Sequence, residues 1–104
     1  MLTKSAGDLY LEMVKVIDKA AADHNIYDVP KSAEAAGMTG GEVKSGGFSQ
    51  HWDYSYTDGQ GDKLDVNFYW RDKSSPFSIH RGHHVMSVYL SGSHNSNHTN
   101  TYDE

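Results

Sequence analysis

The first part of the chain has the hydrophobic pattern of a helix. Its apolar residues recur three or four positions apart: Leu9, Met13, Val16, Ile17 and Ala20. Most of the charged residues in this stretch fall on the other faces of the same helix. Ser5, followed three positions later by Asp8, is close to a capping box. We therefore expect an amphipathic helix of about 18 residues that ends near residues 24–25.

A second, shorter helix is indicated between Pro30 and Gly37. Proline is favoured at the first position of a helix, and glycine is favoured just after the last one. Further glycines follow at positions 40, 41, 46 and 47, and they predict a mobile connector.

From Phe48 onward the apolar positions alternate with polar ones, which is typical of strands. Four strands are predicted, at residues 48–57, 63–71, 75–80 and 84–91. Because the connections between them are short, we expect neighbours in sequence to pair antiparallel as a meander in the order 1-2-3-4. The long helix should cover the apolar face of this sheet, whose clearest strand contributes Leu64, Val66, Phe68 and Trp70.

These elements predict one α+β domain over residues 1–92, in which a long helix and a short helix pack on a four-stranded antiparallel meander. Residues 93–104 are mostly uncharged and polar, with no large apolar residue before Tyr102. We expect this tail to be disordered and dispensable for folding.

Composition narrows the classes of function. The chain has no cysteine, which excludes disulfides, thiolate nucleophiles and cysteine-bound zinc. A net charge of −5 disfavours non-specific binding of nucleic acid, which depends on clustered Lys and Arg. No apolar run approaches the ~18 residues of a membrane span, and the start of the chain does not resemble a signal peptide. We expect a soluble, cytoplasmic protein that does not bind membranes.

The predicted register places several histidines on the polar face of the sheet. One cross-strand row would contain Asp53, Asn67, His80 and His83. A second row would contain His51, Tyr69, Ser78 and Val85, with Arg71 and Tyr89 beside the two rows. His84 has the opposite parity and should point towards the edge of the core.

Two histidine spacings could suit a metal ion. One is the group His80, His83 and His84, and the other is the pair His94 and His98. The second pair would need a helix, but the segment around it is a poor helix former. We expect neither a physiological metal nor a cofactor.

The pattern favours a non-enzymatic module that binds a larger protein. Tyrosine and arginine dominate the energetics of many interfaces, and both occur on the predicted polar face. The candidate binding residues are His51, Tyr69, Arg71, His80, His83 and Tyr89. We expect an inhibitor or an immunity-type protein, of phage or bacterial origin, whose acidic charge helps it approach a nucleic-acid-handling partner.

Two alternatives remain open. The first is a metal-independent ribonuclease of the toxin type, in which imidazoles transfer protons and an arginine holds the phosphate. Its candidate catalytic residues are His51, Asp53, Arg71, His80 and His83. The second is a helix-turn-helix regulator, because Ala33, Gly37 and Val43 have the required spacing and Met38 fits as a packing residue. Its recognition helix would span residues 38–46, with glycines at its centre.

Overall fold

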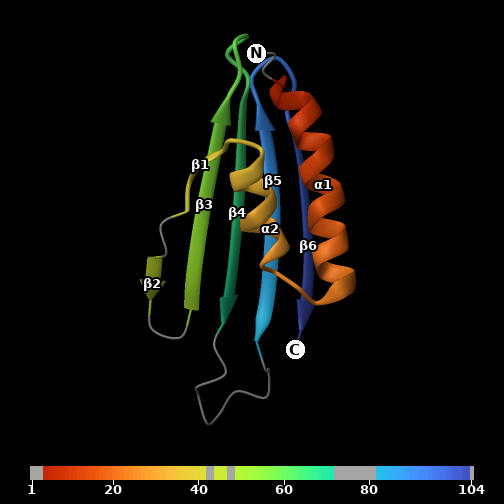
Figure 1. The fold of residues 1–104 in the computed structure, drawn as a ribbon, viewed down its shortest axis with the longest axis vertical. Helices are drawn as coiled ribbons and strands as arrows, with labels where there is room; N and C mark the ends of the chain where they lie inside the picture. Colours follow the sequence, from red (N-terminus) through yellow and green to blue (C-terminus); the bar gives the residue numbers. More distant parts are fainter. Residues whose placement is uncertain (1–3, 42–43, 47–48, 72–81, 104) are drawn as a thin grey trace.

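The computed structural model describes residues 4–41, 44–46, 49–71 and 82–103. These residues form an α+β fold with two helices and an antiparallel sheet, as the sequence predicts (Figure 1). The helices are α1 (Ala6–Asp23) and α2 (Asp28–Ala35). The strands are β1 (Thr39–Gly40), β2 (Lys44–Gly46), β3 (Ser49–Thr57), β4 (Lys63–Arg71), β5 (His83–Ser91) and β6 (Ser96–Asp103).

Helix α1 matches the prediction in both length and position. It has 18 residues, and the hydroxyl of Ser5 caps its first turn by accepting the N–H of Asp8 at 3.1 Å. It ends at His24, which adopts a left-handed backbone conformation with φ 53°. Neither described helix has the length and apolar character required to cross a membrane.

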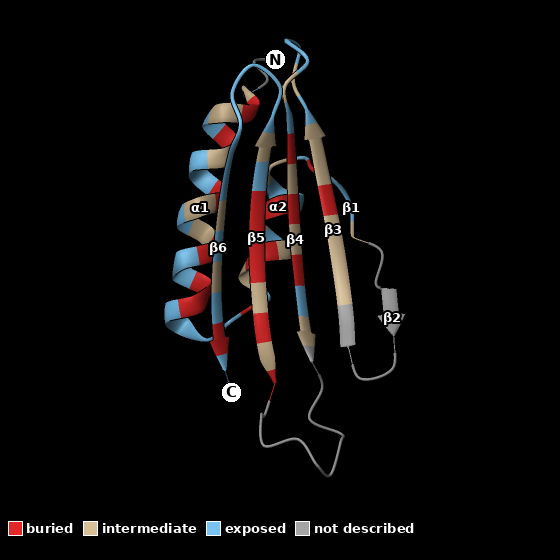
Figure 2. Ribbon diagram, turned by 180° about the vertical axis from the view of Figure 1, so that it is seen from behind, coloured by how far each residue is buried: buried red, intermediate tan, exposed pale blue. Residues whose placement is uncertain are grey.

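The sheet follows the path β1-β3-β4-β5-β6, and β2 also pairs with β3. All of these pairings are antiparallel. Both helices lie on one face of the sheet (Figure 1). Apolar residues of β4 and β5 are buried against α1. In β4 the buried positions alternate with more exposed ones, whereas in β5 the consecutive residues Met86, Ser87 and Val88 are all buried (Figure 2). The predicted core residues Leu64, Val66 and Phe68 are all buried, whereas Trp70 is half-buried.

The predicted four-stranded order is wrong, because β4 pairs directly with β5. Their register runs from Lys63 opposite Ser91 to Arg71 opposite His83, so the predicted third strand at 75–80 does not lie between them. Residues 72–81 themselves lie outside the described residues. Direct pairing aligns the buried apolar side chains of β4 and β5 on the helical face, for example Phe68 opposite Met86. The register between β4 and β5 is thus determined by the match between two long alternating strands, and not by short connections to a strand between them.

The expectation of a disordered tail is also wrong. Strand β6 lies within residues 93–104 and pairs with β5 along its whole length, from Ser96 opposite Leu90 to Asp103 opposite His83. Its sequence, SNHTNTYD, lacks the apolar alternation of a strand because most of its side chains meet solvent or the polar side of α1. Tyr102 is the exception, since it is 6% exposed and belongs to the core.

Candidate functional site

The face of the sheet opposite the two helices is covered by no described helix, and we call it the open face (Figures 1 and 2). Side chains alternate between the two faces of a strand, so the neighbours of the buried residues point to the open face. From the central strands it carries His51, Asp53, Ser55, Asp65, Asn67, Tyr69, Val85, Ser87 and Tyr89. From the edge strand it carries Asn97, Thr99 and Thr101.

The predicted register is confirmed between the first two long strands and wrong beyond them. Asp53 lies opposite Asn67, and His51 lies opposite Tyr69, as expected. On the other side of β4, Asn67 lies opposite Ser87, and Tyr69 lies opposite Val85. The predicted partners of these two residues were His80 and Ser78, which lie outside the described residues.

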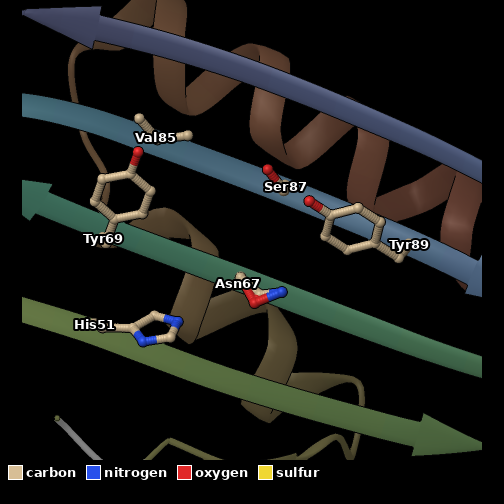
Figure 3. A pocket seen from close by; sticks show the side chains of 6 residues that line it. All are labelled: His51, Asn67, Tyr69, Val85, Ser87 and Tyr89. Atoms are coloured by element: carbon tan, nitrogen blue, oxygen red, sulfur yellow. The ribbon is translucent and has the colours of Figure 1, made fainter.

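Six of the open-face residues line a shallow hollow of about 360 Å³. They are His51, Asn67, Tyr69, Val85, Ser87 and Tyr89 (Figure 3). Tyr69 and Tyr89 border the hollow at its two ends, and the row formed by Asn67 and Ser87 lies between them (Figure 3). The two tyrosines are 38% and 44% exposed, which is high for aromatic residues in the middle of strands. Ser87 was not predicted as a site residue, because the strand predicted at residues 75–80 would separate it from Asn67.

The charged groups of the open face lie around this hollow. At one side, Nε2 of His51 lies 2.9 Å from Oδ1 of Asp53. Towards one end of the sheet, Nζ of Lys63 lies 3.8 Å from Oδ1 of Asp65. Towards the other end, Nδ1 of His83 lies 2.6 Å from Oδ1 of Asp103.

These pairs place three carboxylates and one lysine around a hollow whose other lining groups are hydroxyls, an amide, aromatic rings and one valine. With neutral histidines, the described rim is acidic. The side chain of Arg71 lies outside what the structure describes, although its backbone pairs with Ser49 and His83.

The remaining described histidines do not belong to this face. His84 is 6% exposed and points to the core side, as its parity predicted, and its Nδ1 donates to the carbonyl oxygen of Gly82 at 3.1 Å. His98 faces α1, where its Nε2 lies 2.7 Å from Oδ1 of Asp18. The hydrogen bonds from His98 and Asn100 lower the pKa of the Asp18 carboxyl.

This arrangement separates the histidines of the ribonuclease alternative. His51 lies on β3 and His83 on β5, with β4 between them, and their positions along the strands differ by two residues. With strands ~4.8 Å apart and a rise of ~3.4 Å per residue, their Cα atoms are about 12 Å apart. His80 and the side chain of Arg71 lie outside the described residues. On the open face, the described residues therefore provide two separate His–Asp pairs, His51 with Asp53 and His83 with Asp103, and neither pair has the other imidazole directly beside it.

The helix-turn-helix alternative is contradicted by the connection after α2. Thr39 and Gly40 form β1, which pairs with β3, and residues 44–46 form β2, which pairs with the same strand. The proposed recognition helix over residues 38–46 is thus replaced by two short edge strands. Gly40, at φ 124°, lies so close to β3 that an added Cβ would be 2.2 Å from the carbonyl oxygen of Asp53. Val43 lies outside the described residues.

No group of three His, Asp or Glu side chains in the described ranges has the arrangement of a metal site. Neither a protein-family model, nor a curated protein, nor a solved structure matches the chain. The candidate site accordingly depends on the geometry of the open face alone.

Proposed function

We propose that the open face is a docking surface for a larger protein and that the chain acts by binding, without catalysis. The observation that carries this proposal is the pair of exposed tyrosines, Tyr69 and Tyr89, which border a hollow at the centre of the sheet. Tyrosine is enriched at interface hot spots, where its ring fills a pocket and its hydroxyl finds a polar partner. An interface of this kind has a neutral centre and a polar rim.

The negative charge of the chain favours a partner with a basic surface. The described rim carries Asp53, Asp65 and Asp103, and the whole chain has a net charge of −5. A basic patch on the partner would complement this rim and would accelerate encounter. Proteins that handle nucleic acid carry such patches. The proposal therefore extends to an inhibitor or immunity-type protein, phage or bacterial, that works in the cytoplasm and occludes a basic surface of its target.

The exposed tyrosines provide a direct test, because the chain contains a matched control. Tyr27 is 66% exposed and directly precedes α2, and its ring contacts that of Trp70 on the helical side of the sheet. The wild-type chain, the double variant Tyr69→Ser/Tyr89→Ser and the control Tyr27→Ser would each be used to capture proteins from a host lysate for mass spectrometry. Circular dichroism and a melting curve would establish that all three are folded.

We expect one protein to be enriched by the wild type and by the Tyr27 variant, and lost with the double variant. Equal enrichment by the wild type and the double variant would contradict docking through the open face. Metal-independent cleavage of RNA by the purified wild type would contradict the non-catalytic part of the proposal.

A further inference from the structure

The hollow of the open face has a floor of hydrogen-bonding side chains. Asn67 lies opposite Ser87 across the β4–β5 pair, and both residues line the hollow. Ser87 is 7% exposed, and its hydroxyl lies 2.9 Å from that of Thr99 on β6. An amide oxygen and a hydroxyl oxygen can each accept a hydrogen bond from a ligand. The floor can therefore receive a group that carries several N–H donors.

Two tyrosine rings lie beside this floor. Tyr69 is two residues from Asn67 along β4. Tyr89 is two residues from Ser87 along β5, on the other side of the floor. Figure 3 shows the hydroxyl of Tyr89 directed towards Ser87, so this ring extends towards the floor. The face of an aromatic ring attracts a cation, most often a guanidinium group. The hollow thus combines hydrogen-bond acceptors with two surfaces that favour positive charge.

A second hollow, of about 380 Å³, adjoins the first and contains carboxylates. Its lining includes Asp53 and Asp65. Asp53 lies opposite Asn67 across the β3–β4 pair, where facing side chains are about 5 Å apart. Asp65 precedes Asn67 by two residues on β4, which is about 7 Å, and it lies opposite Tyr89. The two hollows therefore meet beside Asn67, which has a carboxylate on two of its sides.

The lysines and the arginine of these strands are farther from Asn67. Lys63 and Arg71 each lie four residues from it along β4, at about 14 Å between Cα atoms. Lys44 lies on β2, two strands from β4, and its Cα atom is about 12 Å away. The side chains of Lys44 and Arg71 lie outside what the structure describes. Nζ of Lys63 is 3.8 Å from Oδ1 of Asp65, which is too long for a hydrogen bond, so it offsets only part of that charge. Because Coulomb interactions weaken with distance, the potential beside Asn67 favours a cation.

A guanidinium group matches this combination better than an ammonium group does. It is planar and weakly hydrated, so it can stack on a tyrosine ring, and it has five N–H donors in a fixed fork. One such group above Asn67 can donate to the amide oxygen there and to a neighbouring carboxylate at the same time. A lysine ammonium is a compact and strongly hydrated charge, which suits a carboxylate but gains less from the rings.

We propose that the open face binds an arginine side chain of its partner protein. The stem of this arginine packs between Tyr69 and Tyr89. Its guanidinium lies above Asn67 and donates to the carboxylates of Asp53 and Asp65. This inference rests on the proposed docking function, and it names the residue of the partner's basic surface that the open face recognises. Arginine and tyrosine are both enriched among the residues that dominate interface energetics.

The test uses acetyl-arginine methylamide as the probe. It would be titrated into the isotope-labelled full chain by NMR at constant ionic strength. The control probe is acetyl-citrulline methylamide, which has nearly the same shape but a neutral urea group. We expect the arginine probe to shift the backbone amides of β4 and β5 around Asn67 and Ser87. The citrulline probe should bind at least about fivefold more weakly, because it cannot form an ion pair with the carboxylates.

Two double variants with the same change in net charge assign the effect to the carboxylates beside Asn67. Asp53→Asn/Asp65→Asn should weaken the arginine probe by at least about fivefold. The control Asp8→Asn/Asp23→Asn removes two exposed carboxylates from α1, on the helical side of the sheet, and should leave the affinity unchanged. Melting curves would establish that both double variants are folded.

Absence of shifts on the open face up to about 100 mM of the arginine probe would overturn the proposal. So would equal binding of the citrulline probe, or equal effects of the two double variants. In each of these cases, partner capture that still depends on Tyr69 and Tyr89 would leave open-face docking intact, and the arginine assignment alone would fall. Capture that is insensitive to these two tyrosines would contradict docking through the open face itself.

Discussion

The ring of Tyr102 stacks on that of His84, with centroids 4.3 Å apart and planes within 2° of each other. His24, at the end of α1, stacks on the opposite side of the same ring at 5.0 Å. The hydroxyl of Tyr102 also accepts the N–H of Ile26 at 2.8 Å. One side chain near the end of the chain therefore connects β6 to β5 and to the segment between the two helices.

The first prediction concerns this contact. Tyr102→Ala should destabilise the fold by about 3–5 kcal/mol, because it removes a buried ring and leaves the N–H of Ile26 without its acceptor. Tyr102→Phe keeps the ring and should cost only about 1 kcal/mol. Denaturant unfolding of the three chains measures both values. If a chain truncated after Ser93 melted like the wild type, β6 would not be part of the cooperative fold.

The second prediction concerns stability in acid. The carboxylate of Asp58 accepts the N–H groups of Ala6, Gln60 and Asp62 at 2.8, 2.9 and 3.0 Å. These backbone hydrogen bonds, above all the one from Ala6, lower the pKa of Asp58. A carboxyl whose pKa is lower in the folded state stabilises the fold above its unfolded pKa, and this contribution is lost as the pH falls through the folded value.

The variant Asp58→Asn should therefore be less stable than the wild type at pH 7, and the difference should shrink as the pH falls below about 4. Urea unfolding at a series of pH values measures this difference. A gap between the two proteins that stays constant into acid would show that the ionised carboxylate of Asp58 does not contribute.

The third prediction concerns alkaline pH. Tyr54 is 4% exposed and its hydroxyl donates to Oε1 of Glu34 at 3.0 Å. Burial first, and then the hydrogen bond and the charge of Glu34, raise the pKa of Tyr54 to about 12. Because the folded pKa is raised, the stabilisation is complete below about pH 10 and is lost as the pH rises towards 12.

Ultraviolet titration of tyrosinate should show a late step, from Tyr54, well after the ionisation of the exposed tyrosines. The variant Glu34→Gln should bring this late ionisation to lower pH, because it removes the negative charge beside the hydroxyl. The control Tyr54→Phe should abolish the late step. Persistence of the step in Tyr54→Phe would assign it to another tyrosine.

Periodicity alone was enough to predict much of the fold. The 3.6-residue repeat from Leu9 to Ala20 predicted α1, and the alternation around Phe68 predicted the central strand and its buried face. Strand β6 was missed because its partners are polar: His98 and Asn100 meet Asp18, and Thr99 bonds Ser87. Such a strand has no local signature, since its stability comes from a neighbour distant in sequence.

The candidate site was predicted in part. Tyr69, Tyr89 and His51 were assigned to one face from parity, and all three line the hollow. The prediction was wrong about the partner of β4, which is β5 and not a strand at residues 75–80. With one long connection between β4 and β5, Ser87 lies beside Asn67. Parity can be read from a local pattern, but pairing across a sheet depends on long-range contacts that the pattern does not contain.

The most direct test of open-face docking is a calorimetric titration of the captured partner with four forms of the chain: wild type, Tyr69→Ala, Tyr89→Ala and Tyr27→Ala. If the two open-face tyrosines are hot spots, each of their variants should bind about 30-fold more weakly, which corresponds to ~2 kcal/mol. The Tyr27 variant should stay within about twofold of the wild type, as expected for a surface change outside the interface. Wild-type affinity for both open-face variants, with a loss for Tyr27→Ala, would place the interface on the helical side and contradict the account.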